Sequence, residues 1–261
     1  MTAVLWHIEI SHYNEKARWA LDYKGVPHRR RAPLPGVTAP FALALTRGHQ
    51  RRLPVLQLDG ETVGDSTAII AALERTWPEP PLYPADPGER ARALELEEFF
   101  DEQLAPEIRR FVWHHTLGDA RGTAATVATG SRIRRAAVRA LTPLARPAIR
   151  LDYQISEANA LRAQDRIHAV MDRVEDELRR GGGSYLVGDR FGVADLAAAA
   201  LFTPVICPPE CQYPPPSVAP RILALREELR ERPGGVWVSE IYARLNVRDR
   251  VQAVLKSLGE I

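Results

Sequence analysis

The sequence predicts an α/β domain followed by an all-α domain, and three observations support this prediction. Strand-like alternation of apolar and polar residues occurs only before residue 64, whereas helical periodicity dominates after residue 88. Between the two, residues 77–87 contain five prolines and no periodicity, which is typical of a semi-rigid linker. We therefore expect a first domain at 1–76, a linker at 77–87 and a helical domain at 88–261.

Size and composition exclude several classes of protein. A chain of 261 residues, 45% of them hydrophobic, can bury a full core. Its net charge of +2 gives no argument for nucleic-acid binding, and two cysteines suit a reducing compartment. The N-terminus lacks a signal-peptide pattern, and the longest apolar run, about 14 residues from Leu196, is shorter than a bilayer span requires. We expect a cytoplasmic protein, and the scarcity of lysine beside many arginines suggests a GC-rich bacterial genome.

The first 27 residues predict a strand, a tight turn and a helix. Residues 4–10 form the strand, and a helix face begins after Ser11. Gly25 stands where a left-handed residue ends a helix, and Pro27 prevents continuation. Ser11 therefore lies beside the free N–H groups of a helix start, where thiolates and other anions are stabilised.

In the rest of the first domain, predicted strands and helices again follow one another. Asp59-Gly60 is a strong hairpin signal, and Pro54 should mark a strand entrance because proline interrupts a central ladder. Asp65 or Ser66 is expected to cap the last helix. The expected elements are a strand, a loop, a short helix, a hairpin and a helix at 28–32, 33–40, 41–46, 51–63 and 65–76. This order predicts a thioredoxin-like domain.

The second domain reads as helices and loops. Residues 193–202 are apolar nearly all round, so this helix should be central and buried. Residues 118–130 should be a loop, and Pro143 and Pro147 should separate two short helices. The expected helices span 90–112, 133–141, 144–151, 165–178, 193–202, 222–229 and 236–245.

Four segments of the chain match the motifs of a known family. They are SHYNEKAR with KGVP at 11–18 and 24–27, LPV at 53–55, GDSTAII at 64–70, and LVGDRFGVAD at 186–195. On these motifs the chain resembles the glutathione S-transferase superfamily, in a form with serine at the active-site turn. In the last motif, Asp195 is expected to accept a hydrogen bond from the Gly192 N–H, which keeps half of a capping box.

The resemblance implies a binding site for glutathione as a thiol co-substrate. Leu53, before a cis-Pro54, would pair through its backbone with the cysteinyl part of the tripeptide. Asp65 and Ser66 would hold the γ-glutamyl end, although Asp65 is shorter than the usual Glu or Gln. Arg52 would meet the glycyl carboxylate. The structural alternatives are a strand-entry proline, a simple helix cap and a surface arginine.

The resemblance also implies a role for the turn. Glutaredoxin-like relatives carry two cysteines there, and their replacement by Ser11 and Asn14 argues against thiol–disulfide exchange. The Ser11 hydroxyl would donate to a bound thiolate. A free thiol has a pKa of about 8.5, and lowering it by one or two units corresponds to about 1.4–2.8 kcal/mol. Tyr13 is the second candidate for this role, and Ser11 as a plain N-cap is the structural alternative.

The predicted function is a glutathione S-transferase that conjugates or adds the glutathione thiolate to a small hydrophobic electrophile, as in detoxification. By resemblance it would be a homodimer, with the acceptor held by the helical domain. The alternative is a non-catalytic ligand-binding or interaction protein of the same fold, or one that uses a different low-molecular-weight thiol. No metal is expected, because His114-His115 lacks companion ligands, and Cys207 and Cys211 are expected to be buried reduced thiols.

Residues 120–151 depart from the family pattern, with seven arginines and no acidic residue. The favoured interpretation is a solvated basic face. A lid that favours anionic substrates and an interfacial helix on acidic lipid headgroups are the less favoured ones. Nucleic-acid binding is not expected, because no aromatic residues interleave with the arginines.

Overall fold

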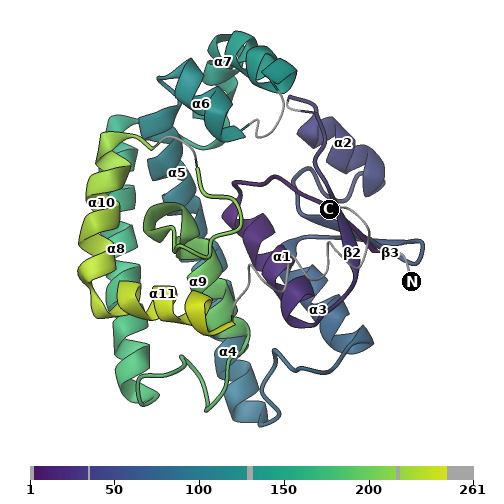
Figure 1. Cartoon of the computed structure of the whole chain (residues 1–261), viewed down its shortest axis with the longest axis vertical. Helices are drawn as coiled ribbons and strands as arrows, with labels where there is room; N and C mark the ends of the chain where they lie inside the picture. Colours follow the sequence, from purple (N-terminus) through teal and green to yellow (C-terminus); the bar gives the residue numbers. More distant parts are fainter. Residues whose placement is uncertain (1–2, 35, 128–131, 216–217, 246–261) are drawn as a thin grey trace.

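A computed structural model describes residues 3–34, 36–127, 132–215 and 218–245 of the chain. Parts of the expected loops at 33–40 and 118–130, the side chain of Arg134 and the end of the expected domain at 88–261 lie outside the described residues. Figure 1 shows a small sheet with its helices beside a larger helical domain.

The sheet has four strands in the order β2-β1-β3-β4. β1 pairs in parallel with β2, whereas β1 with β3 and β3 with β4 are antiparallel. Asp59 and Gly60, both with positive φ, make the turn of the β3–β4 hairpin. The strands are β1 (Ala3–Trp6), β2 (His28–Arg31), β3 (Val55–Leu58) and β4 (Glu61–Gly64). The predicted thioredoxin-like arrangement is confirmed.

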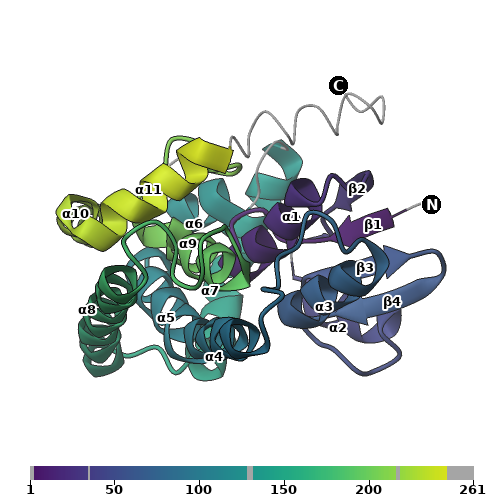
Figure 2. The same ribbon diagram turned by 90° about the horizontal axis from the view of Figure 1, so that it is seen from below.

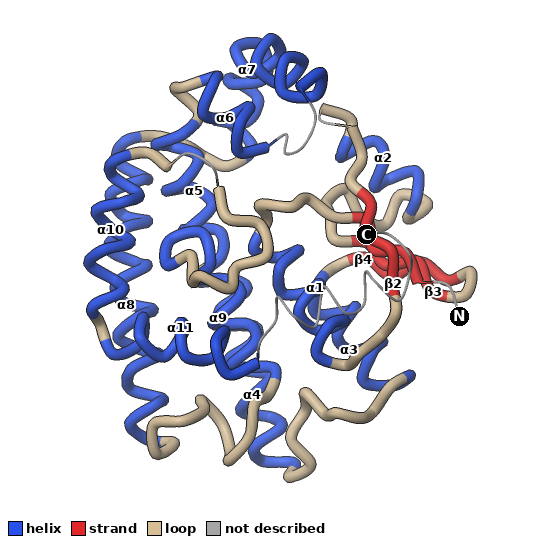
Figure 3. Tube along the Cα trace, in the orientation of Figure 1, coloured by secondary structure: helices blue, strands red, loops and turns tan. Residues whose placement is uncertain are grey.

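The two faces of this sheet carry helices, as Figure 3 shows. Leu5 and Leu56 pack with the core formed by α1 (His12–Tyr23) and α3 (Ser66–Thr76). Trp6 and Val55, one residue along each strand, pack instead with Ala42 of α2 (Thr38–Leu45). This division follows from the alternation of side chains along a strand.

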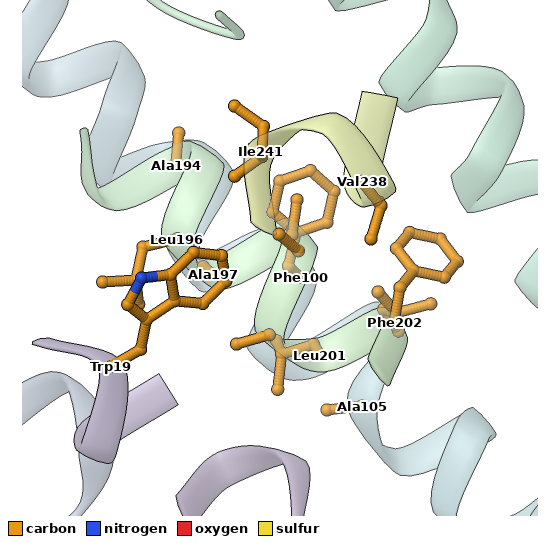
Figure 4. Packing of buried hydrophobic residues seen from close by; sticks show 14 of the residues in the cluster. Trp19, Phe100, Ala105, Ala194, Leu196, Ala197, Leu201, Phe202, Val238 and Ile241 are labelled. Carbon is orange, nitrogen blue, oxygen red and sulfur yellow. The ribbon is translucent and has the colours of Figure 1, made fainter. Parts of the chain in front are cut away.

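The helical domain is built around α9 (Val193–Ile206), whose residues are almost all buried as predicted. Figure 4 shows Trp19 of α1 packed beside Leu196 and Ala197 of this helix. Asp195 accepts from the Gly192 N–H at 2.9 Å and the Leu186 N–H at 2.7 Å, which confirms the predicted cap. The other helices of this domain, seen from another side in Figure 2, are α4 (Pro87–Gln103), α5 (Ala105–Thr116), α6 (Ala120–Val127), α7 (Arg132–Asp152), α8 (Glu157–Arg180), α10 (Pro220–Glu231) and α11 (Pro233–Leu245).

Three predictions about these helices were wrong. The single helix expected over 90–112 is two helices that meet at Leu104, with Pro106 in the first turn of the second. Residues 120–127 form α6 rather than a loop. α7 is continuous, with Pro143 and Pro147 inside it. Both prolines are exposed, so water can satisfy the carbonyls that lose their helical N–H partners.

The connection from α3 to α4 is held by Lys24. Its buried ammonium donates to the Trp77 carbonyl at 2.7 Å and the Pro80 carbonyl at 3.0 Å, and pairs with Glu74 at 2.5 Å. This contact fixes the proline-rich stretch against the end of α1. Within the described parts of the chain, no helix has the length and apolar content needed to cross a membrane.

Candidate active site

The turn before α1 leaves the Ser11 hydroxyl free to donate. Ser11 is the N-cap of α1, but its side chain does not cap the helix. Its Oγ instead accepts a hydrogen bond from Asn14 Nδ2 at 2.7 Å. An oxygen that accepts keeps its own proton, so the half-buried hydroxyl can donate to a further group beside the helix N-terminus.

Asn14 connects this turn to the Leu53–Pro54 segment. Its Nδ2 also donates to the Leu53 carbonyl at 3.2 Å, and its Oδ1 accepts from the Ile8 N–H at 3.1 Å. Asn14 is fully buried, so these bonds satisfy an amide that water does not reach. Among the described residues, no group accepts from the Leu53 N–H, which therefore remains available.

The start of α3 lies against the same segment. The peptide bond between Leu53 and Pro54 is cis, as the family resemblance implied. The Pro54 carbonyl accepts from the Asp65 N–H at 3.2 Å. The Asp65 carboxylate accepts from the N–H groups of Thr67 and Ala68, so the residue caps α3. Asp65 is exposed, with a φ of 77°, and Ser66 beside it is buried.

The backbone of Asp65 is under strain. A positive φ is uncommon outside glycine, and such conformations cost about 1–3 kcal/mol when imposed at a functional site. The ψ of 138° lies outside the left-handed helical region in which aspartate is enriched, so the residue type does not relieve the strain. The structure thus brings Ser11, Leu53, Pro54 and Asp65 together through Asn14 and one backbone hydrogen bond.

Two other predicted residues point elsewhere. Tyr13 donates its hydroxyl to the Asp101 carbonyl of α4 at 2.8 Å, and burial raises the pKa of Tyr13 well above its ordinary value. Arg52 lies 3.3 Å from Asp152 at the end of α7 and over the Tyr153 ring. The Tyr13 proton is committed within the protein, and Arg52 is partnered outside the Leu53–Asp65 region.

Two cavities flank the turn. The first, with a volume of about 60 Å³, is lined by Ser11 and His12 together with Val112 and Thr116 of α5 and residues of α9 and α10. The second, with a volume of about 190 Å³, lies between residues 7–9, the segment at 32–38 and α7. We call them the serine cavity and the α7 cavity, and Glu9 lines both.

The aromatic residues of α4 and α5 divide between the hydrophobic core and a cavity. Trp113 lines the α7 cavity. Phe100 and Phe111 are fully buried in the main core, and Phe99 packs against that core. Apolar lining next to a free hydroxyl can hold a hydrophobic molecule close to the turn.

Two family models match the chain. The model described as "Glutathione S-transferase, N-terminal domain" matches residues 5–81, and "Glutathione S-transferase, C-terminal domain" matches residues 133–233. The two matches together span more than half of the chain. The chain belongs to the glutathione S-transferase family.

Individual relatives agree with this assignment. The chain is 31% identical over 94 residues to glutathione S-transferase U6 of Arabidopsis thaliana, which covers 36% of this chain and 42% of the relative. It is 43% identical over 56 residues to probable maleylacetoacetate isomerase 1 of Drosophila melanogaster, covering 22% and 23%. The matched segments thus span less than half the length of these relatives.

A solved structure shares the fold. It is a glutathione S-transferase from Methylobacterium radiotolerans in complex with glutathione sulfonate, with a TM-score of 0.54 and 24% identity, covering 90% of this chain and 93% of that one. The thioredoxin-like N-terminal domain and helical C-terminal domain are therefore those of glutathione S-transferases.

A buried ionic cluster joins the two domains behind the turn. The fully buried Lys16 ammonium lies 2.8 Å from Glu97 and 2.5 Å from Asp101, both on α4, and donates to Thr67 of α3 at 2.9 Å. Burial disfavours the ammonium, but the two carboxylates outweigh it and raise the pKa of Lys16. Burial also raises the pKa of Glu97 against the opposing effect of Lys16.

The family motifs in the sequence assign no role to Lys16. Its rarity was a usable signal, because the chain has only three lysines beside its many arginines. Lys16 and Lys24 are both buried and both paired across chain segments. The ammonium group of lysine is compact and can donate hydrogen bonds in three directions, whereas the guanidinium of arginine is a planar fork. A lysine therefore suits a buried site whose acceptors lie on several sides.

Arg18 was also missed as a support for the turn. Its buried guanidinium donates to the Glu9 carbonyl at 2.8 Å and the Ile8 carbonyl at 3.2 Å. It pairs with Glu15 at 2.7 Å. These bonds fix the backbone that leads into Ser11, so its position does not depend on local turn preference alone.

His12 contributes a neutral imidazole to the serine cavity. Burial, together with the smaller effect of the Arg109 charge, lowers the pKa of His12 to about 3. Its Nε2 is buried and has no hydrogen-bond partner. At neutral pH, His12 therefore carries no charge that would compete with Ser11 for an anion.

Proposed function

We propose that this chain is a glutathione-dependent transferase that conjugates or adds the glutathione thiolate to a small hydrophobic electrophile. Family membership supports the glutathione-dependent class. The observation that carries the proposal is the hydrogen bond from Asn14 to Ser11, which leaves the Ser11 proton available beside a helix N-terminus. A donor at that place stabilises a thiolate more than a thiol, so it lowers the thiol pKa.

The remaining proposed residues surround this hydroxyl. The free Leu53 N–H, beside Pro54, would pair with the backbone of the cysteinyl residue. Asp65 would receive the α-amino group of the γ-glutamyl end, and the buried Ser66 with the α3 N-terminus would hold its α-carboxylate. Arg52 would reach the glycyl carboxylate after leaving Asp152.

In the proposed reaction, the thiolate sulfur attacks the electrophilic carbon of the acceptor. In a substitution, the leaving group departs with the electron pair of its bond. In an addition, the acceptor later takes a proton from solvent. Ser11, rather than Tyr13, would stabilise the thiolate, because the Tyr13 proton is already donated to Asp101. The apolar cavities on either side of the turn would hold the acceptor.

We also propose that the protein is a cytoplasmic homodimer, in which domains at 1–76 and 88–261 are joined by the linker at 77–87.

The second candidate function is that of a non-catalytic binding protein with the same thiol site. The small serine cavity favours a compact acceptor, whereas a sequestering protein would need to enclose a larger ligand.

The first test is calorimetric titration of reduced glutathione into the full chain. We expect saturable binding, weakened at least about tenfold in Asp65→Asn, because one lost ionic contact in a partly desolvated site costs about 1.5 kcal/mol or more. Asparagine caps helices as well as aspartate, so this change should spare α3. Asp86→Asn, at the cap of α4, is the matched control and should bind as the parent does.

A second measurement separates the two candidate functions. The ultraviolet absorbance of the thiolate gives the pKa of the bound thiol, and a lowered value followed by conjugation to a chloronitrobenzene supports the transferase. Binding with an unshifted thiol pKa and no turnover would support the binding protein. If glutathione did not bind, it would be excluded as the co-substrate. Other low-molecular-weight thiols would then be titrated in its place.

A further inference from the structure

The outer surface of α7 exposes large apolar side chains. Leu144, Ile133 and Leu151 are 78%, 83% and 82% exposed, and Leu141 is 49% exposed. Their spacing places all four within about a quarter of the helix circumference. Exposed alanines and the two prolines widen this apolar sector. The helix is anchored by its other side, where Val138 and Thr142 are buried.

A band of arginines lies along one edge of this sector. Its described members are Arg132, Arg135, Arg139 and Arg150, all exposed. None of these four forms an ion pair with another described residue. α7 carries no acidic residue before Asp152, which is already paired with Arg51 and Arg52. Four cations without an ion-pair partner among the described residues therefore border the widened apolar sector, and exposed alanines and prolines lie between them and the leucine and isoleucine side chains.

Neither simpler interpretation explains this combination. A solvated basic face accounts for the arginines but not for large apolar residues that remain about four-fifths exposed. An antiparallel contact between the α7 helices of two copies would cover the apolar sector but would also bring the two arginine bands to the same side of the contact. Like charges at that distance oppose association. The charge pattern requires an acidic partner.

We propose that α7 is a peripheral membrane-binding helix that docks on anionic phospholipid. The apolar sector inserts among the acyl chains near the headgroups, and the arginine band contacts phosphate and carboxylate groups. This arrangement is the one expected of an interfacial amphipathic helix. Its basic residues are arginines, which form paired hydrogen bonds with phosphate oxygens.

The place of α7 in the molecule suits this role. Figure 1 shows it at one end of the long axis, so a flat surface can meet it without contacting the sheet. Leu34 and Val37 are also exposed, on a segment whose neighbours line the α7 cavity. Leu141 belongs to the exposed apolar sector and also lines the α7 cavity, so α7 itself would separate the membrane from that cavity.

The test is co-sedimentation of the full chain with vesicles. We expect binding to phosphatidylcholine vesicles that contain one third phosphatidylserine, and no binding to pure phosphatidylcholine. Binding should fall steeply as salt is added, because screening weakens the arginine contacts. Leu144→Ser with Leu151→Ser should weaken it at least about tenfold. Arg135→Gln with Arg139→Gln should weaken it roughly tenfold or more.

Matched variants control for general charge and hydrophobicity. Leu161→Ser changes an exposed leucine of α8, and the double variant Arg179→Gln with Arg190→Gln removes two positive charges away from α7. Both control variants should bind vesicles as the parent does. Thermal unfolding midpoints establish that each variant is folded. Absence of binding to acidic vesicles, or equal loss in the control variants, would overturn the proposal. If the parent were a dimer that did not bind vesicles, and the two leucine substitutions made it monomeric, the apolar sector would be an interface with a second copy of the chain instead.

Discussion

The side-chain amide of Asn14 donates a hydrogen bond to the Ser11 hydroxyl at 2.7 Å. This contact fixes the direction of the serine proton, because an amide N–H can only donate and the hydroxyl must then donate elsewhere. The same amide nitrogen holds the Leu53 carbonyl. One buried residue therefore positions both the proposed thiolate donor and the proposed backbone site for the cysteinyl residue.

Replacing Ser11 by alanine should raise the pKa of bound glutathione by about one unit or more, because the thiolate loses a hydrogen-bond donor. The matched change Tyr13→Phe should leave that pKa unaltered, since the tyrosine proton is donated to Asp101. Absorbance of the thiolate against pH, at saturating protein, measures both. A shift in Tyr13→Phe alone would assign the role to Tyr13.

Asn14→Asp should impair thiol activation strongly, although aspartate and asparagine have nearly the same shape. A carboxylate would accept the Ser11 proton, which would then no longer face the thiol, and it would repel the Leu53 carbonyl. We expect a thiol pKa at least as high as in Ser11→Ala. Asn14→Ala leaves the hydroxyl free to turn, so it should have the smaller effect on the thiol pKa, with a loss of about 1–3 kcal/mol in unfolding free energy. If Asn14→Asp lowered the thiol pKa, the assigned direction of the bond would be wrong.

The glycyl carboxylate of glutathione and the Asp152 carboxylate should compete for the Arg52 guanidinium. Asp152→Asn releases both arginines from an exposed pair, so glutathione affinity should rise by up to about fivefold, within the range of surface ion pairs. Arg52→Met should lower the affinity, and adding Asp152→Asn to it should then give no gain. Calorimetry of the double-mutant cycle tests this, and an equal gain in the presence of Arg52→Met would exclude Arg52 from the site.

Lys16→Met should destabilise the protein by about 3–5 kcal/mol at neutral pH, because the buried Glu97 carboxylate and the partly buried Asp101 carboxylate lose their cation. The deficit should shrink as pH falls. The folded-state pKa of Glu97 is already above its ordinary value of 4.5, and loss of Lys16 raises it further. A raised pKa contributes stability that is present below 4.5 and is lost as pH rises through the folded value.

Urea unfolding at about pH 5 and pH 7 measures this change. The parent should vary less over that interval, since the pKa of Lys16 is raised from 10.5 and its contribution is lost only in alkali. Adding Glu97→Gln and Asp101→Asn to Lys16→Met should restore much of the loss. A deficit that stays constant between the two pH values would show that lost packing, rather than uncompensated charge, is the cause.

Much of the fold was predictable because it follows local patterns. Alternation and the Asp59-Gly60 signal predicted the strands and hairpin, and continuous apolarity predicted the buried position of α9. The continuity of α7 was not predictable from the rule that proline breaks helices. That rule assumes that the freed carbonyls lack water, whereas Pro143 and Pro147 are exposed.

The candidate site was predictable where it depends on local chemistry. The capping role of Asp65 follows from residue type and position, whereas the cis bond before Pro54 was expected from the family resemblance and not from the local pattern. The partners of Lys16 and Arg52 lie 85 and 100 residues away, on helices of the other domain. Such pairings arise only when two elements pack, so no single segment of sequence encodes them.

The helix that follows Ser11 belongs to both domains at once. One side packs on the sheet. On the other side, the Trp19 ring centroid lies 4.2 Å from that of Tyr242 with the two rings tilted, and Lys16 is paired with Glu97 of α4. Isolated from the C-terminal part, residues 1–76 would present an unshielded tryptophan and an unpaired ammonium to water. The chain should therefore unfold as a single cooperative unit. A protease cut between α3 and α4 should leave two fragments that remain associated until a denaturant separates them.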